Sequence, residues 1–337
     1  MKNIFKKAKN IFLKGYYYSH QKVDTPVIPM IQNIEATNAC MMNCKMCPRK
    51  YMTRKIGFID LGLFERIVSQ LKGNTRVALH HFGEPLLHPK IGRLIEICHK
   101  YGIKASISTN PSSLTLEKSR ELINAKLDYL HISLDGANKE TYENIRGGSA
   151  NYEKALEGMR TFLKEKQELK SKLPYTKIAI IRMKETEKEI DEFKKKWGET
   201  QGIDEVQVKE FITWDGTMDD IKELEQEASH KVKRKKIYPC FWPWGKLTVL
   251  WDGRVAACCF DFDGKCILGD LNKQTLEEIW NSDRMKRFRL QHVNEKFPDN
   301  HLCKNCRERE GFVPSKIFPL NMIIEGRLNF LNYFKSN

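Results

Sequence analysis

The chain has 337 residues, of which 41% are hydrophobic and 30% charged, and its formal net charge at pH 7 is +15. This length suffices for one large domain, or for a large domain with a small one. No apolar run approaches the roughly 18 residues of a membrane span, and residues 1–15 lack the apolar core of a secretory signal. The composition therefore excludes an integral membrane protein and predicts a cytoplasmic one.

The ten cysteines and the excess of basic residues both bear on function. In a chain without a secretory signal, this many cysteines favour metal or redox chemistry over disulfides. The positive charge is compatible with an acidic partner, but it also suits a solvated, lysine-rich surface. No nucleic-acid-binding motif accompanies the charge, so we expect no nucleic-acid partner.

Residues 1–30 read as a basic N-terminal extension in which apolar residues recur at helical spacing between lysines. An amphipathic helix of this kind either docks on its own domain or lies on a membrane surface. We favour docking, so peripheral membrane contact through this extension is the weaker alternative.

An alternation of strand-like and helical sequence begins at Met30. Six strands are predicted at residues 30–36, 76–80, 104–108, 129–134, 176–181 and 205–208, with helices at 61–71, 91–101, 116–125, 140–145, 152–166 and 187–197. Strands separated by helical crossovers pair in parallel, so the pattern predicts an α/β fold with a parallel sheet.

Three cysteines, Cys40, Cys44 and Cys47, follow the first predicted strand in a C-x3-C-x2-C pattern. Thiolates are the usual ligands of iron–sulfur clusters, and a cubane cluster normally takes four of them. A loop with three leaves one iron open for a ligand that is not protein. A structural zinc knuckle or three buried thiols is the alternative interpretation.

This spacing, with apolar Met46 directly before the third cysteine, resembles the motif of the radical S-adenosylmethionine (SAM) superfamily. The resemblance implies a [4Fe–4S] cluster whose open iron binds the amino and carboxyl groups of SAM. It also implies cleavage of SAM to a 5′-deoxyadenosyl radical that abstracts hydrogen, with an external one-electron donor of the flavodoxin or ferredoxin type. The implied fold is a partial (β/α)6 TIM-like barrel with its chemistry at the carboxyl ends of the strands.

Later strand ends carry further family-like segments. The segment at residues 81–85 resembles the family's G-G-E motif, which contacts the SAM amino group, and the segment at 133–136 resembles its S-x-D-G motif. A segment at 145–148 also resembles one in relatives with C-terminal clusters, without an assigned role. The candidate SAM-binding residues are Met46, Gly83, Glu84, Asn110, Ser133, Asp135 and Arg182. Taken singly, each of the four strand-end groups is better explained as turn or cap chemistry. Their recurrence at successive strand ends after the cysteine loop favours SAM binding.

A second cysteine set lies in the last third of the chain. Cys240 and Cys258 frame a C-x12-G-x4-C pattern with a predicted hairpin at 246–257, and Cys303 and Cys306 form a C-x2-C pair. The pattern resembles the SPASM/twitch extension of radical SAM enzymes and implies one auxiliary [4Fe–4S] cluster in a small α+β domain. Structural zinc at these four thiols is the alternative, and Cys259 or Cys266 could replace one ligand.

These assignments divide the chain into an N-terminal extension (1–30), a radical SAM core (31–210), a linker (211–239), an auxiliary cluster domain (240–311) and a tail (312–337). The nearest resemblance is to the twitch dehydrogenases of aminocyclitol biosynthesis. It implies an oxidoreductase acting on a sugar, cyclitol or small polar alcohol, with the auxiliary cluster as electron acceptor. A peptide-modifying maturase and a non-catalytic iron–sulfur redox sensor are the alternatives.

Overall fold

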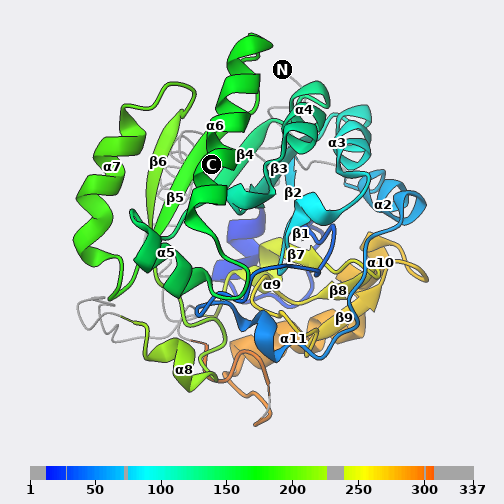
Figure 1. Cartoon of the computed structure of the whole chain (residues 1–337). Helices are drawn as coiled ribbons and strands as arrows, with labels where there is room; N and C mark the ends of the chain where they lie inside the picture. Colours follow the sequence, from blue (N-terminus) through cyan, green and yellow to red (C-terminus); the bar gives the residue numbers. More distant parts are fainter. Residues whose placement is uncertain (1–12, 28, 72–74, 226–238, 300, 307–337) are drawn as a thin grey trace.

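A computed structural model describes residues 13–27, 29–71, 75–225, 239–299 and 301–306 (Figure 1). Within these residues the strands form one nine-stranded sheet in the order β6-β5-β4-β3-β2-β1-β7-β8-β9. Their bounds are β1 (Met30–Ile34), β2 (Arg76–Ala78), β3 (Lys104–Thr109), β4 (Tyr129–Ser133), β5 (Tyr175–Arg182), β6 (Glu205–Glu210), β7 (Lys246–Val249), β8 (Arg254–Ala256) and β9 (Ile267–Asp270).

Strands β1 to β6 pair in parallel with their sequence neighbours, as the alternation predicts. The helices that connect them lie outside the sheet (Figure 1). The helices of the described chain are α2 (Leu61–Val68), α3 (Ile91–Lys100), α4 (Leu116–Asn124), α5 (Lys139–Arg146), α6 (Tyr152–Glu168), α7 (Ile190–Gly198), α8 (Asp219–Lys222), α9 (Trp242–Gly245), α10 (Leu276–Asn281) and α11 (Asp283–Val293). The partial barrel expected for the core is therefore confirmed.

Side-chain hydrogen bonds define where several helices begin. Asp60 accepts from the amides of the first turn of α2, Thr115 caps α4, and Asn138 and Asn151 cap α5 and α6. Such caps satisfy amide groups that have no partner within the helix. They set the lengths of the crossovers, and so fix where each strand end meets the cavity described below.

The main hydrophobic core lies between the parallel strands and their helices. Residues of the inner strands, such as Ile107 on β3 and Ile132 on β4, are fully buried in it, whereas Val206 and Val208 of β6 are only partly buried. A second apolar cluster lies at the carboxyl ends of the strands and includes Met42, Met46 and Phe82.

The C-terminal hairpin extends the core sheet, which the sequence did not predict. β7 pairs in parallel with β1, from Met30 opposite Lys246 to Ile34 opposite Val249, and β8 and β9 then continue the sheet antiparallel. The cysteine loop after β1 and the cysteines after β8 consequently lie on adjoining parts of one continuous sheet.

Residues 13–19 are helical, and the segment 13–27 docks on the C-terminal half of the chain. The Tyr18 hydroxyl donates to the Pro239 carbonyl at 2.6 Å, and its ring packs edge-on against Trp244 at 5.6 Å. Trp244 Nε1 in turn donates to the Lys22 carbonyl at 2.8 Å. This part of the extension therefore follows the docking alternative; the lysine-rich residues 1–12 lie outside the described chain.

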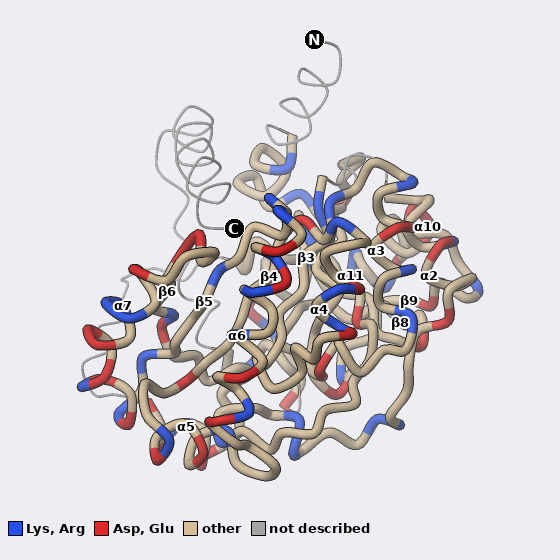
Figure 2. The backbone as a smooth tube through the Cα atoms, turned by 45° about the horizontal axis from the view of Figure 1, so that its top comes forward, with Lys and Arg blue, Asp and Glu red and all other residues tan. Residues whose placement is uncertain are grey.

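Lys and Arg residues alternate with Asp and Glu along the outer helices α5, α6 and α7 (Figure 2). This mixture agrees with a solvated basic surface. None of the helices among the described residues is long and apolar enough to cross a membrane.

Candidate functional site

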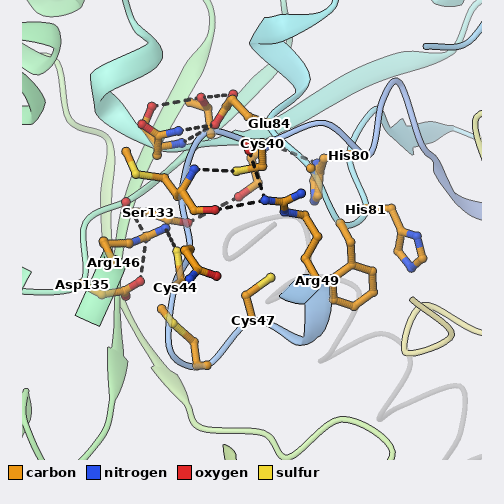
Figure 3. Close-up of a pocket in the computed structure, with 18 of the residues that line it drawn as sticks. Cys40, Cys44, Cys47, Arg49, His80, His81, Glu84, Ser133, Asp135 and Arg146 are labelled. Carbon is orange, nitrogen blue, oxygen red and sulfur yellow. Dashed lines mark hydrogen bonds and ion pairs between the residues drawn. The ribbon is translucent and has the colours of Figure 1, made fainter. Parts of the chain in front are cut away.

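Cys40, Cys44 and Cys47 lie in the loop after β1, and all three line one cavity at the carboxyl ends of the parallel strands (Figure 3). Arg49 Nη2 holds this loop by donating to the carbonyl oxygens of Cys40, at 3.1 Å, and Met42, at 3.2 Å. The loop thus presents three thiols to a shared space, as a three-thiolate cluster requires.

Burial disfavours the charged thiolate form of Cys40 and Cys47 in this loop. It raises the pKa of Cys40, and it raises the pKa of Cys47 to about 12, with the neighbouring thiol of Cys44 adding to the effect. A bound cation lowers the pKa of a coordinating thiol. Burial therefore favours the protonated form of Cys40 and Cys47 unless a metal cluster binds them.

Glu84 lies in the wall of the same cavity and is buried (2% exposed). Its carboxylate accepts four hydrogen bonds, from the Leu86 amide, the Thr109 hydroxyl, and the amide and side-chain Nδ2 of Asn110, at 2.6–3.1 Å. Burial raises the pKa of Glu84, and these donors partly offset that rise. Glu84 therefore ties the end of β2 to the end of β3.

These hydrogen bonds fix the position of Asn110 and use its backbone amide and its side-chain Nδ2. Its Oδ1 is buried and has no hydrogen-bond partner among the described residues. Since Asn110 lines the cavity, Oδ1 is an acceptor available to an ammonium or amino group bound there.

Ser133 and Asp135 line the cavity from the end of β4, and Arg146 holds both. Arg146 forms an ion pair with Asp135 at 2.6 Å, donates to the Ser133 carbonyl at 2.7 Å, and places Nη1 at 3.7 Å from Cys44 Sγ. The sequence singled out the segment around Arg146 but gave it no role. The structure places it against the cysteine loop.

The residues beside Arg146 complete this contact. The Ile145 carbonyl accepts from the Lys45 amide at 2.9 Å. Gly147, with φ of +53°, lies so close to the loop that a Cβ there would come within 2.8 Å of the Asn43 carbonyl oxygen. Glycine is required here both by the left-handed backbone and by the close approach.

Arg182 does not line this cavity, contrary to its predicted place near SAM or the substrate. Its guanidinium pairs with Glu187 and, at 3.4 Å, with Glu210, and its side chain is one-third exposed. Side chains alternate along a strand, so the neighbouring Ile181 faces the cavity and Arg182 faces away. Arg49 and Arg146 are the arginines that line the cavity.

Trp214 is a cavity residue that the sequence assigned to a linker. Its indole N–H donates to the Met46 carbonyl at 2.8 Å, and its ring packs edge-on against Phe82 at 5.1 Å and Phe260 at 5.6 Å. Its φ is +54°, a conformation that non-glycine residues adopt at a cost of order 1–3 kcal/mol. The contacts with Met46, Phe82 and Phe260, which link the two cysteine regions, hold Trp214 in this strained conformation.

The auxiliary cysteines are drawn from separate elements. Cys240 precedes α9, Cys258 follows β8, and Cys303 and Cys306 follow α11. The pKa of Cys258 is raised by the hydrogen bond that its thiol donates to Cys259 and by burial, and the nearby Cys303 adds to this effect. That all four hold one cluster stays a prediction.

Cys259 and Cys266 have their own neighbours. Cys266 Sγ lies 3.8 Å from His301 Nε2, and burial raises the pKa of Cys266 to about 12. Within the described residues, no three His, Cys, Asp or Glu side chains converge as ligands of a single metal ion.

A buried ionic network joins the two cysteine regions. Arg54 donates to both oxygens of Glu35, each at 2.8 Å, and its Nε donates to the Phe262 carbonyl at 2.8 Å. His81 Nδ1 lies 3.4 Å from the same carboxylate, and its Nε2 lies 2.9 Å from the Cys259 carbonyl. The loop after β1, the end of β2 and the loop after β8 are therefore fastened together.

Comparison with known proteins agrees with this arrangement. Residues 34–197 match the Radical SAM superfamily, and residues 240–307 match SPASM, an iron–sulfur cluster-binding domain. The chain therefore belongs to the radical SAM superfamily and carries a SPASM domain. Its cofactors are a [4Fe–4S] cluster with SAM in the first part and an iron–sulfur cluster in the second.

Two relatives match most of the chain. The tungsten-containing aldehyde ferredoxin oxidoreductase cofactor-modifying protein of Pyrococcus furiosus is 24% identical and aligns over 82% of this chain and 87% of its own length. The SAM-dependent 2-deoxy-scyllo-inosamine dehydrogenase of Niallia circulans is 21% identical over 81% of this chain and 90% of its own. Among solved structures, SuiB of Streptococcus suis bound to its precursor peptide SuiA covers 90% of this chain and 72% of its own, with a TM-score of 0.58 and 16% identity.

We predict that Gly83→Ala weakens SAM binding about tenfold or more. A Cβ at Gly83 would lie 2.2 Å from the Thr37 carbonyl oxygen, 2.8 Å from Asn38 Cα and 3.0 Å from the Ala39 carbonyl oxygen. These are backbone atoms just before the cysteine loop, so the loop must shift; overpacking of this kind typically costs about 1–3 kcal/mol. Equilibrium dialysis with labelled SAM measures the effect.

Gly198→Ala is the matched control, because a Cβ at the end of α7 meets nothing within 4 Å. It should leave SAM affinity unchanged. Equal affinities in wild type and Gly83→Ala would show that the close approach of Gly83 to the loop does not shape the SAM site.

Proposed function

We propose that this chain oxidises a sugar, cyclitol or small polar alcohol by radical hydrogen abstraction. The proposal is supported most directly by the contacts of Glu35, Arg54 and His81. They connect the SAM cavity to the loop after β8, which carries Cys258. A one-electron acceptor held beside a radical site is what oxidation requires.

We assign the SAM cluster to Cys40, Cys44 and Cys47, and the auxiliary [4Fe–4S] cluster to Cys240, Cys258, Cys303 and Cys306. When bound, these groups supply a 5′-deoxyadenosyl radical and a one-electron acceptor, once an external donor of the flavodoxin or ferredoxin type has provided one electron. The substrate carbinol loses a hydrogen atom, then a proton and an electron, and becomes a ketone.

The chain's own residues position these groups. Asn110 Oδ1, kept in place by Glu84, accepts from the SAM amino group, and Ser133 and Asp135, held by Arg146, border the remainder of the ligand. Trp214 and Phe82 cover the cavity on the side of the auxiliary loop and exclude water from it.

The test removes the auxiliary ligands and keeps the first cysteine loop intact. With Cys303→Ser/Cys306→Ser we expect SAM to be cleaved at a rate within a few fold of wild type, while the ketone falls by at least tenfold. The measurement is the ratio of ketone to 5′-deoxyadenosine for a panel of cyclitols and sugars.

A wild-type ratio near one supports the proposal, and an unchanged ratio in the double variant contradicts it. Turnover of a peptide and none of the alcohols would favour a peptide-modifying maturase, the reaction class suggested by the likeness to the peptide-bound SuiB structure.

A further inference from the structure

Lys209 is a partly exposed basic residue on the interior face of β6. It is the penultimate residue of β6, an edge strand, and it is paired in register with Ile181, which lines the cavity. Val206 and Val208 pack against the main hydrophobic core between the strands and the helices. Because side chains alternate along a strand, Lys209 lies on the opposite face of β6 and points to the barrel interior.

The other charges near Lys209 are already paired. Asp135 forms its ion pair with Arg146 and accepts from the Ile181 amide at 2.9 Å, and Lys177 pairs with Glu205 at 2.9 Å. Within the described chain, no hydrogen bond or ion pair is formed by Lys209. Lys209 is therefore a basic side chain near Asp135 that no carboxylate among the described residues pairs with directly.

The remaining neighbours of Lys209 are neutral. Burial lowers the pKa of His80 to about 3 and that of His131 to about 2, with the charge of Lys209 contributing to each. Burial lowers the pKa of Lys209; the Asp135 carboxylate offsets part of this effect, and the charges of Lys177 and Arg146 add to it. An anion beside Lys209 would relieve this repulsion, and the Ser133 side chain on the cavity wall adds a neutral donor.

We propose that Lys209 binds an anionic group, a carboxylate or a phosphate, of the substrate. The inference deepens the proposed function and rests on it: the polar alcohol carries this anionic group at the β6 side of the barrel, where Lys209 lies beside the lining residue Ile181 without itself lining the cavity. The SAM candidates Glu84 and Asn110 lie after β2 and β3, several strands away in the sheet. The anionic group thus lies away from Glu84 and Asn110 and close to Asp135, at the opposite border of the SAM site.

The test uses acetate and inorganic phosphate as probes, on anaerobically reconstituted protein saturated with SAM. Equilibrium dialysis at fixed ionic strength should show one saturable site in wild type, a loss of affinity of at least tenfold in Lys209→Met, and retention within about threefold in Lys209→Arg. Lys195→Met, on the exposed face of α7, is the control and should behave as wild type. The probe that binds more tightly identifies the carboxylate or the phosphate class.

SAM affinity is measured on the same variants. An equal loss of SAM binding in Lys209→Met would overturn the inference, since Lys209 would then serve SAM. Unchanged binding of both anions in Lys209→Met would also overturn it. Neither result depends on turnover, so absence of a ketone product would contradict the proposed oxidation and leave the anion site standing.

Discussion

Replacing Cys40, Cys44 and Cys47 together by alanine is expected to abolish 5′-deoxyadenosine formation and to lower the iron content from about eight to about four per chain. Among the described residues that line the cavity, these three are the only cysteines. No other thiol there can substitute, so the SAM cluster is lost while the auxiliary cluster is retained. Iron, sulfide and zinc contents after anaerobic reconstitution, with chromatography of 5′-deoxyadenosine, measure both effects.

Cys98→Ala is the control for loss of a buried thiol. Cys98 lies in the helix-side core on α3, away from the cavity, so its replacement should lower stability slightly and leave the iron content unchanged. A wild type with about four irons that falls to none in the triple variant, with one zinc retained, would contradict the two-cluster assignment. It would leave a core radical enzyme with a zinc site in its C-terminal domain.

Arg54→Met is expected to destabilise the fold by about 3–5 kcal/mol, because it leaves the Glu35 carboxylate buried without its partner. Glu35 is fully buried, and the Arg54 side chain is only 3% exposed. Urea unfolding at pH 7 measures the change. Lys164→Met is the matched control: its ion pair with Glu168 is exposed, so its removal should cost less than about 1 kcal/mol.

The same interaction should depend on pH. Burial alone would raise the pKa of Glu35, but hydrogen bonds from His81 and Arg54 outweigh it and hold the pKa at about 2, below the ordinary 4.5. The contribution is therefore complete above pH 4.5 and is lost as the pH falls toward 2. The difference between wild type and Arg54→Met should shrink over that interval.

The double variant Glu35→Gln/Arg54→Met separates the charge from the packing. It removes the buried charge, so it should recover part of the stability lost in the single variant. A double variant as unstable as Arg54→Met would show that the cost lies in the lost hydrogen bond to the Phe262 carbonyl and not in the stranded carboxylate.

The sequence by itself determined the strand–helix alternation of the core and the two cysteine sets. These signals are local: apolar periodicity decides helix or strand, and the spacing of Cys40, Cys44 and Cys47 is readable without a fold. Glu84 and Asn110 were also found, because in a parallel barrel residues at strand ends meet at one mouth.

The set of arginines that line the cavity could not be read from the sequence, because it depends on which way each side chain points and on which loops meet at the strand ends. Arg182 faces away from the cavity, whereas Arg146, the last residue of α5, lines it. Other features depend on segments far apart in the chain. They are the pairing of β7 with β1, the position of Trp214 in the cavity and the position of Lys209 at the barrel interior. Such contacts leave no periodicity in the sequence, since they are set by how the sheet closes and not by neighbouring residues.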